Sequence, residues 1–180
     1  MNDPIGDEVY TRWVIKEAFT ELLGVSSFEK ITVHSIVRKA GISRSTFYLH
    51  FQDKYDLLNQ MTEQIIEELL ELYGKFEDDE MLLNMNIAYT KGKPCQNAVE
   101  ICEHIKTNNQ FYCNRFKDIN FVNSLTDRLF SRLRLIYKDE SHGIFAAYGT
   151  VGCISRWLAE GLKGSSDEIA LRMASVALPR

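Results

Sequence analysis

The chain has 180 residues, of which 45% are hydrophobic and 26% charged, and only three are proline. This balance is typical of a globular protein that buries a core, either as one body or as a small domain followed by a larger one. The net charge of −4 argues against a uniformly basic nucleic-acid binder, and apolar residues recur mostly at helical spacing, so we expect an all-α fold of about nine to ten helices.

The first predicted helix covers residues 8–23. Val14, Ala18 and Phe19 fall on one stripe of this helix, and Gly24 suits the position after its last turn. A short loop over 25–30 follows.

Two short helices come next, joined by the sequence Ala-Gly-Ile-Ser. Thr32 suits the N-cap of a helix over 33–40, and Ser43 suits the N-cap of a helix over 44–50. Gly41 between them allows a left-handed turn that other residues adopt only at a cost. Asp53 then caps a longer helix that runs to about Tyr73. This order predicts a helix-turn-helix motif that spans Thr32 to Phe51.

The second helix of such a motif lies in the major groove of DNA, so its outer face needs side chains that reach bases and phosphates. The spacing turns Ile42, Phe47 and Phe51 inward. It leaves an outer face of Arg44, Ser45, Thr46, Tyr48 and Leu49, with His50 and Lys54 following as candidates for phosphate contact. Arg44 suits a bidentate contact with a guanine edge, and the first backbone N–H groups of the 33–40 helix attract phosphate.

The charge distribution agrees with this interpretation. Residues 30–54 hold five basic side chains against one acid, a net +4, which leaves −8 for the rest of the chain. Segregated charge of this kind is typical of a basic DNA-binding domain on an acidic body, although charged stretches are more often solvated surface.

Residues 31–58, ITVHSIVRKAGISRSTFYLHFQDKYDLL, closely resemble the DNA-binding domain of tetracycline-repressor-like (TetR family) regulators. The resemblance implies a three-helix DNA-binding domain over 1–52, extending to about 68 with the linking helix, and a ligand-sensing and dimerisation domain over 53–180. It implies a homodimer that binds double-stranded DNA at a palindromic operator. The family's base and phosphate contacts fall on Thr32, Val33, Arg44, Ser45, Thr46, Tyr48, His50 and Lys54.

Two positions depart from the family pattern. Leu49 stands where many relatives carry an aromatic residue, which puts a stacking or methyl contact there in doubt. The loop over 25–30 lacks the glycine of many members.

Beyond an acidic break at 77–80, further helices are expected over 81–90, 94–106, 109–116, 119–137, 141–162 and 166–178. Pro94 fits the first turn of its helix, and Ser166 with two following acids suits the start of the last helix.

Gly149 and Gly152 lie inside a predicted helix, where each costs ~1 kcal/mol relative to alanine. Close approach of another helix is the usual compensation. We therefore expect a subunit interface formed by the last two helices, with Gly149, Gly152, Ile154 and Trp157 at the contact. A tight contact within one chain is the alternative. This half also resembles the family branch that includes activators of dihydroxyacetone kinase operons, in which the body acts through a partner protein.

Methionine and aromatic residues between these segments suit an adaptable apolar pocket for a small-molecule effector, although an ordinary core is the simpler interpretation. The candidates are Met81, Met85, Tyr89, Tyr112, Phe116, Phe121 and Phe130.

Other classes of function find no support in the sequence. No enzyme motif occurs, so we expect no catalytic activity and no cofactor. The cysteines and His104 do not form a metal-binding pattern, so we expect no metal site. The acidic first residues do not resemble a signal peptide, and the longest uncharged apolar run, over 144–155, is too short to cross a bilayer. The expected protein is a cytoplasmic DNA-binding regulator, in most family members a repressor. A coactivator or adaptor that works through a protein partner is the alternative.

Overall fold

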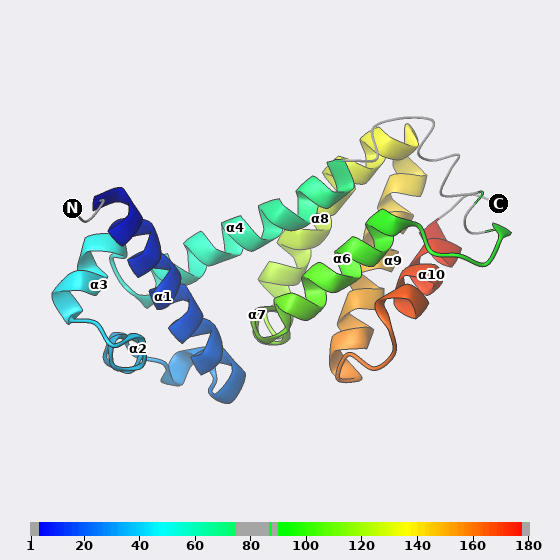
Figure 1. Ribbon diagram of the computed structural model, residues 1–180. Coiled ribbons are helices and arrows are strands. Elements are labelled where there is room, and N and C mark those ends of the chain that lie inside the picture. The colour runs from blue at the N-terminus through cyan, green and yellow to red at the C-terminus, as the bar shows by residue number, and fades with distance from the viewer. Residues whose placement is uncertain (1–3, 75–86, 88–89, 178–180) are drawn as a thin grey trace. The chain divides into compact units, whose positions relative to one another are not determined.

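The computed structural model describes residues 4–74, 87 and 90–177 (Figure 1). Over these residues the secondary structure comprises nine α-helices and one 3₁₀ turn without a strand, which confirms the all-α prediction. The chain divides into two compact units, Met1–Ile65 and Ile66–Arg180. The boundary falls within helix α4 (Lys54–Gly74).

The first unit contains α1 (Pro4–Val25), the 3₁₀ turn η1 (Phe28–Lys30), α2 (Val33–Ala40), α3 (Arg44–His50) and the start of α4. In Figure 1, α2 and α3 lie beside α1 and are joined by a short turn. Helices α2 and α3 have the predicted bounds, whereas α1 extends beyond 8–23 at both ends. The core of this unit is made of fully buried apolar side chains from all four helices, including Ile15, Phe19, Ile36, Phe47, Phe51 and Leu57.

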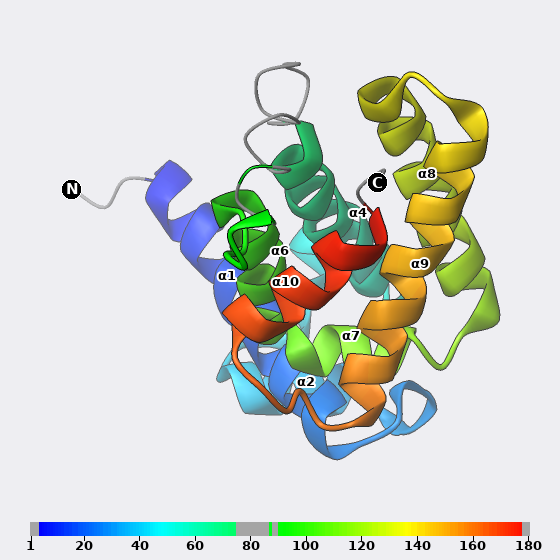
Figure 2. The same ribbon diagram turned by 90° about the vertical axis from the view of Figure 1, so that its right-hand side faces the viewer.

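The second unit contains α6 (Gln96–Thr107), α7 (Asn109–Arg115), α8 (Ile119–Tyr137), α9 (Glu140–Ala159) and α10 (Ser166–Ala177). Figure 2 shows α9 beside α8, with α10 packed against both α9 and α6. At the α8–α9 contact a Cβ on Gly143 would lie 2.9 Å from the Cα of Arg134, so the absence of a side chain permits this close approach.

Beyond α1, two predicted helix ends differ from the structure, the start of α6 and the end of α9, whereas α10 begins at Ser166 as expected. Pro94 precedes α6, whose N-cap is Cys95. Helix α9 ends at Ala159, because Gly161 and Leu162 adopt left-handed backbone conformations and turn the chain. The start of α10 is capped by Ser165, which exchanges hydrogen bonds with Glu168. The Ser166 side chain is buried instead. Of the helix expected over 81–90, only residues 87 and 90 lie within the described residues.

Among the described residues, no helix combines the length and the apolar character needed to cross a membrane.

Candidate nucleic-acid interface

Local hydrogen bonds define the turn between α2 and α3. The Thr32 hydroxyl accepts a hydrogen bond from the Ser35 amide, and the Ser35 side chain accepts one from the Thr32 amide, which forms a capping box. Gly41 ends α2 with φ +69°. The Ser43 hydroxyl then accepts a hydrogen bond from the Thr46 amide at the start of α3. The start and end of α2 and the start of α3 are therefore specified by Thr32, Gly41 and Ser43, which the sequence analysis identifies.

Helix α3 has one buried and one exposed face. Phe47 is 0% exposed, and Phe51, which directly follows the helix, is 1% exposed, with 5.7 Å between the two ring centroids. On the opposite face Arg44 and Ser45 are exposed, and Leu49 is 82% exposed. Ile42, expected to face inward, is half-buried.

The hydroxyl groups at the start of α3 are linked to one another. The Ser43 Oγ lies 2.7 Å from the Ser45 Oγ and 2.8 Å from the Thr46 Oγ1. Ser45 is exposed and Thr46 is half-buried. These hydrogen bonds hold the three hydroxyl groups together at the start of α3.

The remaining predicted DNA contacts on these helices differ in exposure. Tyr48 is 56% exposed and its ring packs edge-on against Phe47 at 5.5 Å. His50 is half-buried, and within the described residues its Nδ1 is buried with no hydrogen-bond partner. At the start of α2, Thr32 is exposed and Val33 is half-buried.

Lys54 has a different environment from the one expected for a phosphate contact. Its ammonium donates hydrogen bonds to the carbonyl oxygens of Phe28, Glu29 and Ile31 at 3.0, 3.2 and 2.8 Å. It also lies 4.5 Å from the centroid of the Phe28 ring. An ammonium has three N–H donors, so all of them are directed at the turn that precedes α2. Sequence reasoning missed this because the 3₁₀ turn that presents the carbonyl oxygens was not predicted.

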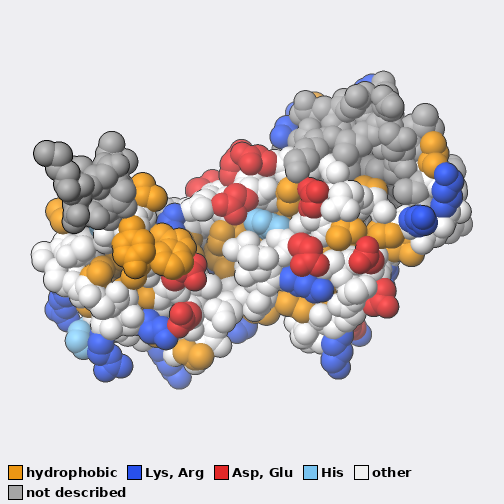
Figure 3. Space-filling model, viewed as in Figure 1, with side chains coloured by type: hydrophobic (Ala, Val, Ile, Leu, Met, Phe, Trp, Pro, Cys, Tyr) orange, Lys and Arg blue, Asp and Glu red, His pale blue; other side chains and the backbone are white. Residues whose placement is uncertain are grey.

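Positive charge gathers over α2 and α3. Figure 3 shows Lys and Arg side chains along the lower edge of the first unit. Lys30, Arg38, Lys39 and Arg44 are all exposed, and Lys39 forms an ion pair with Glu21 on α1. The surface beside the exposed face of α3 is therefore attractive to a polyanion.

Of the four residues expected at a subunit interface, two are buried within the chain and two are at least partly exposed. Ile154 and Trp157 are 1% and 3% exposed within their own chain, and the Trp157 Nε1 donates a hydrogen bond to the Lys163 carbonyl oxygen at 2.9 Å. Gly149 is half-buried. Gly152 is exposed, with open space where a Cβ would lie. The close helix contact inside the chain is thus at Gly143.

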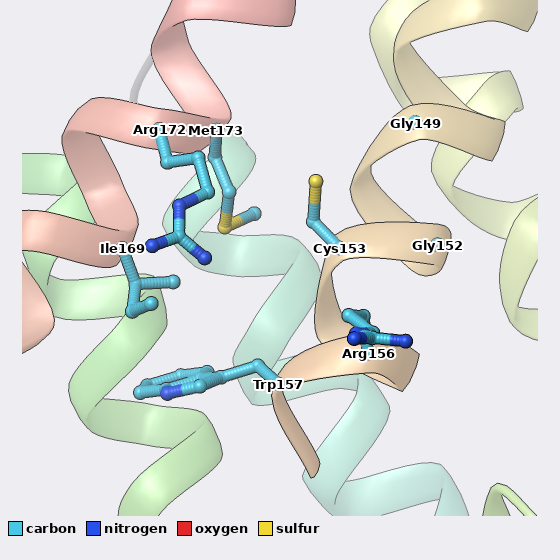
Figure 4. Close-up of a pocket in the computed structure, with 8 residues that line it drawn as sticks. All are labelled: Gly149, Gly152, Cys153, Arg156, Trp157, Ile169, Arg172 and Met173. Carbon is cyan, nitrogen blue, oxygen red and sulfur yellow. The ribbon is translucent and has the colours of Figure 1, made fainter. Parts of the chain in front are cut away.

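The exposed face of α9 carries large apolar side chains that sequence reasoning did not single out. Ile144, Phe145 and Tyr148 are 43%, 60% and 66% exposed. One turn further along, a groove of about 250 Å³ opens between α9 and α10, with Gly152 at its edge. Figure 4 shows Ile169, Arg172 and Met173 extending from α10 toward α9, and Trp157 extending from α9 beneath them.

The residues expected to line an effector pocket fall into three groups. Tyr112, Phe116 and Phe121 pack on one another at centroid distances of about 6 Å. Tyr112 is fully buried, its hydroxyl lies 3.1 Å from the His104 Nε2, and burial raises its pKa well above the ordinary value. Phe130 is half-buried. The other three lie outside the described residues: Met81, Met85 and Tyr89.

The thiol groups differ in environment. Cys102 is fully buried, and desolvation raises its pKa to about 12, whereas Cys113 is exposed. In the described part of the chain, no three histidine, cysteine or acidic side chains are grouped so that they could hold a metal ion.

The geometry of α2, the Gly41 turn and α3 defines the first unit as a helix-turn-helix DNA-binding domain. Residues 15–61 match the family model described as "Bacterial regulatory proteins, tetR family". Over these residues the chain is similar to the DNA-binding domain of TetR family regulators.

Relatives that match over a longer stretch are named as transcriptional regulators. The chain is 27% identical over 168 residues, 88% of its length, to an uncharacterized HTH-type transcriptional regulator, YxbF, of Bacillus subtilis, of which the match covers 42%. It is 34% identical over 62 residues to the dhaKLM operon transcriptional activator DhaS of Lactococcus lactis, a match that covers 34% of this chain and 33% of that protein. The matches therefore span less than half the length of these curated relatives.

Solved structures share the fold. The dihydroxyacetone kinase operon activator DhaS has a TM-score of 0.70 at 19% identity, covering 94% of this chain and 95% of its own. NalD of Pseudomonas aeruginosa, a secondary repressor of the MexAB-OprM efflux pump, has a TM-score of 0.65 at 18% identity, covering 97% and 98%. At these identities the likeness concerns the fold alone.

Proposed function

We propose that the chain is a sequence-specific transcriptional regulator that reads DNA with the exposed face of α3. The observation that carries this proposal is the division of α3 into a buried face, anchored by Phe47, and an exposed face with Arg44, Tyr48 and Leu49. Arg44 suits the edge of a guanine. Leu49 departs from the family's usual aromatic residue, but its side chain is 82% exposed on the same face and can still make an apolar contact with a thymine methyl group. The basic side chains on α2 and beside α3 supply attraction to phosphate that does not depend on sequence.

The length of α3 supports a homodimer on a palindromic site. Seven residues span about 10 Å, which covers roughly three base pairs. Two copies related by a two-fold axis would read two half-sites about 34 Å apart, the separation of successive major grooves on one face of DNA. We propose that specificity comes from this pairing.

For the dimer contact we propose the exposed face of α9, with Phe145, Tyr148 and Gly152. An isologous interface must be self-complementary, and this face offers both projecting aromatic side chains and an adjacent groove. Ile154 and Trp157 would support this face from the inside. Tyr148→Asp would place a charge at the contact and is expected to yield monomers in sedimentation velocity. Asn120→Asp, at the exposed first turn of α8, is the control and should stay dimeric. A dimeric Tyr148→Asp variant would reject this face.

The proposed DNA recognition is tested by selecting bound duplexes from a random pool with the full chain. The expected product is a palindrome whose half-sites are one helical turn apart, bound less tightly as salt is raised. Failure to enrich any sequence would refute sequence-specific recognition.

We propose repression as the outcome, because a dimer seated on a promoter excludes other proteins from the same DNA. An effector or partner bound to the second unit would relieve repression, because it would favour a conformation with a different distance between the two α3 helices of the dimer. Activation through a protein partner is the second candidate, favoured by the likeness to proteins described as operon activators. A reporter gene placed behind the selected operator distinguishes the two by the direction in which expression changes when the chain is supplied.

A further inference from the structure

Helix α3 has little packing of its own to fix its orientation. Within the helix only Phe47 is buried, so the seven residues are held from inside at a single point. A tilt of about 15° around that point moves the helix ends by roughly 1 Å, which is enough to lose a direct hydrogen bond to a base. The N-terminal end is held by the Ser43 cap and the short turn from α2. At the C-terminal end the buried ring of Phe51 follows directly after the helix, and its position depends on what contacts it from α1 and α4.

Arg12 on α1 lies at that C-terminal end. One guanidinium nitrogen donates to the His50 carbonyl oxygen at 3.4 Å, and the guanidinium carbon lies 4.9 Å from the centroid of the Phe51 ring. The other terminal nitrogen donates to the Gln60 Oε1 on α4 at 2.6 Å. A single planar side chain therefore touches the end of α3, the residue that follows it, and α4.

The contact with α4 continues back toward α3. The Gln60 amide nitrogen donates to the Asp56 Oδ1 at 3.0 Å, and the backbone amide of Gln52 donates to the Asp56 Oδ2 at 2.9 Å. The hydrogen bond from Gln60, followed by that from Gln52 and by the charge of Arg12, lowers the pKa of Asp56, so this acceptor stays ionised at neutral pH. Hydrogen bonds thus join His50, Arg12, Gln60, Asp56 and Gln52 around the junction of α3 and α4.

We propose that Arg12 is a positioning residue for DNA recognition, because it fixes the C-terminal end of α3 against α1 and α4 without contacting a base. This inference rests on the proposed role of α3 in reading DNA. Lysine could not replace arginine fully, since a point charge lacks the planar fork that reaches two acceptors and stacks on a ring.

The chain contains a matched control. One turn further along α1, Lys16 donates a hydrogen bond to Gln64 on α4, so this pair joins the same two helices four residues from the Arg12–Gln60 pair. The proposed test compares Arg12→Met and Gln60→Met with Lys16→Met and Gln64→Met. Methionine retains an apolar stem of similar length in each case.

Each full-length variant is titrated with two duplexes, namely the one that the wild-type chain selects from a random pool and a scrambled duplex of the same composition. We expect Arg12→Met and Gln60→Met to lower the ratio of the two affinities about tenfold, as the loss of one charge-assisted hydrogen bond would. Lys16→Met and Gln64→Met should leave the ratio unchanged. Arg12→Lys should recover only part of it.

The salt dependence separates positioning from direct contact. If Arg12 positions α3, the slope of log affinity against log salt for the scrambled duplex is the same in Arg12→Met and in the wild type. A slope reduced by about one would show a phosphate contact and overturn the inference. A variant that is merely less stable would melt at a lower temperature. Its smaller folded fraction would weaken binding to both duplexes equally, so the ratio of the two affinities would stay unchanged.

An unchanged ratio in both Arg12→Met and Gln60→Met, or an equal loss in the Lys16 and Gln64 variants, overturns this inference while leaving the proposed function intact. If the wild-type chain selects no duplex at all, the proposed function fails and the inference fails with it. The two failures are therefore distinguishable in one series of titrations.

Discussion

Replacing Lys54 by methionine tests whether this side chain acts inside the protein or on DNA. The substitution removes three hydrogen bonds to the carbonyl oxygens of residues 28, 29 and 31 and a cation–π contact with Phe28. Lys54 is half-buried and the freed carbonyl groups regain water, so the net loss is about 2 kcal/mol rather than the sum of the separate interactions. The turn before α2 should open more readily by that amount.

Amide hydrogen exchange, followed by mass spectrometry, measures this loss locally. A difference of about 2 kcal/mol corresponds to roughly 30-fold faster exchange over residues 30–40, with no change over α8 and α9. Lys30→Met is the control, because Lys30 is an exposed cation on the same turn and its loss changes the charge equally. Affinity for DNA should keep its wild-type salt dependence in Lys54→Met. Unchanged exchange together with a salt slope reduced by about one would refute the internal role and restore the phosphate contact expected from sequence.

Three further predictions concern other parts of the chain. Arg44→Ala should lower affinity for the selected duplex by roughly 1–3 kcal/mol and relax base preference at one position of each half-site, as repeated selection would reveal; unaltered preference would exclude Arg44 from base reading. Gly143→Ala should destabilise the second unit by about 1–3 kcal/mol in urea unfolding, because the added Cβ would lie 2.9 Å from the Arg134 backbone. An unchanged or raised stability would contradict the packing described for α8 and α9. Burial raises the pKa of Cys102 from 9.0 to about 12, so above pH 9 the thiol loses its proton in the unfolded chain before it does in the folded one. The free energy of unfolding should therefore fall between pH 9 and 12. Cys102→Ala should reduce that fall, and an identical fall in the variant would show that other groups cause it.

The sequence by itself determines the helix-turn-helix. Thr32, Gly41 and Ser43 specify the ends of α2 and α3 through hydrogen bonds and backbone preferences that involve only near neighbours in the chain. The spacing of Phe47 and Phe51 then decides which face of α3 is buried. Both kinds of information are local, and for this reason the bounds of these two helices and the exposed side chains of α3 could be predicted.

Only the tertiary structure decides which side chains those helices meet. Lys54 caps a turn 23 to 26 residues earlier, and Arg12 joins groups 38 and 48 residues away, so no local pattern could show either contact. Ile154 and Trp157 are residue types that suit a subunit interface, but both are buried inside the chain. Phe145 and Tyr148 on the same helix remain exposed. The physical reason is that helical periodicity gives the relative directions of side chains, whereas their burial depends on neighbours brought together from distant parts of the sequence.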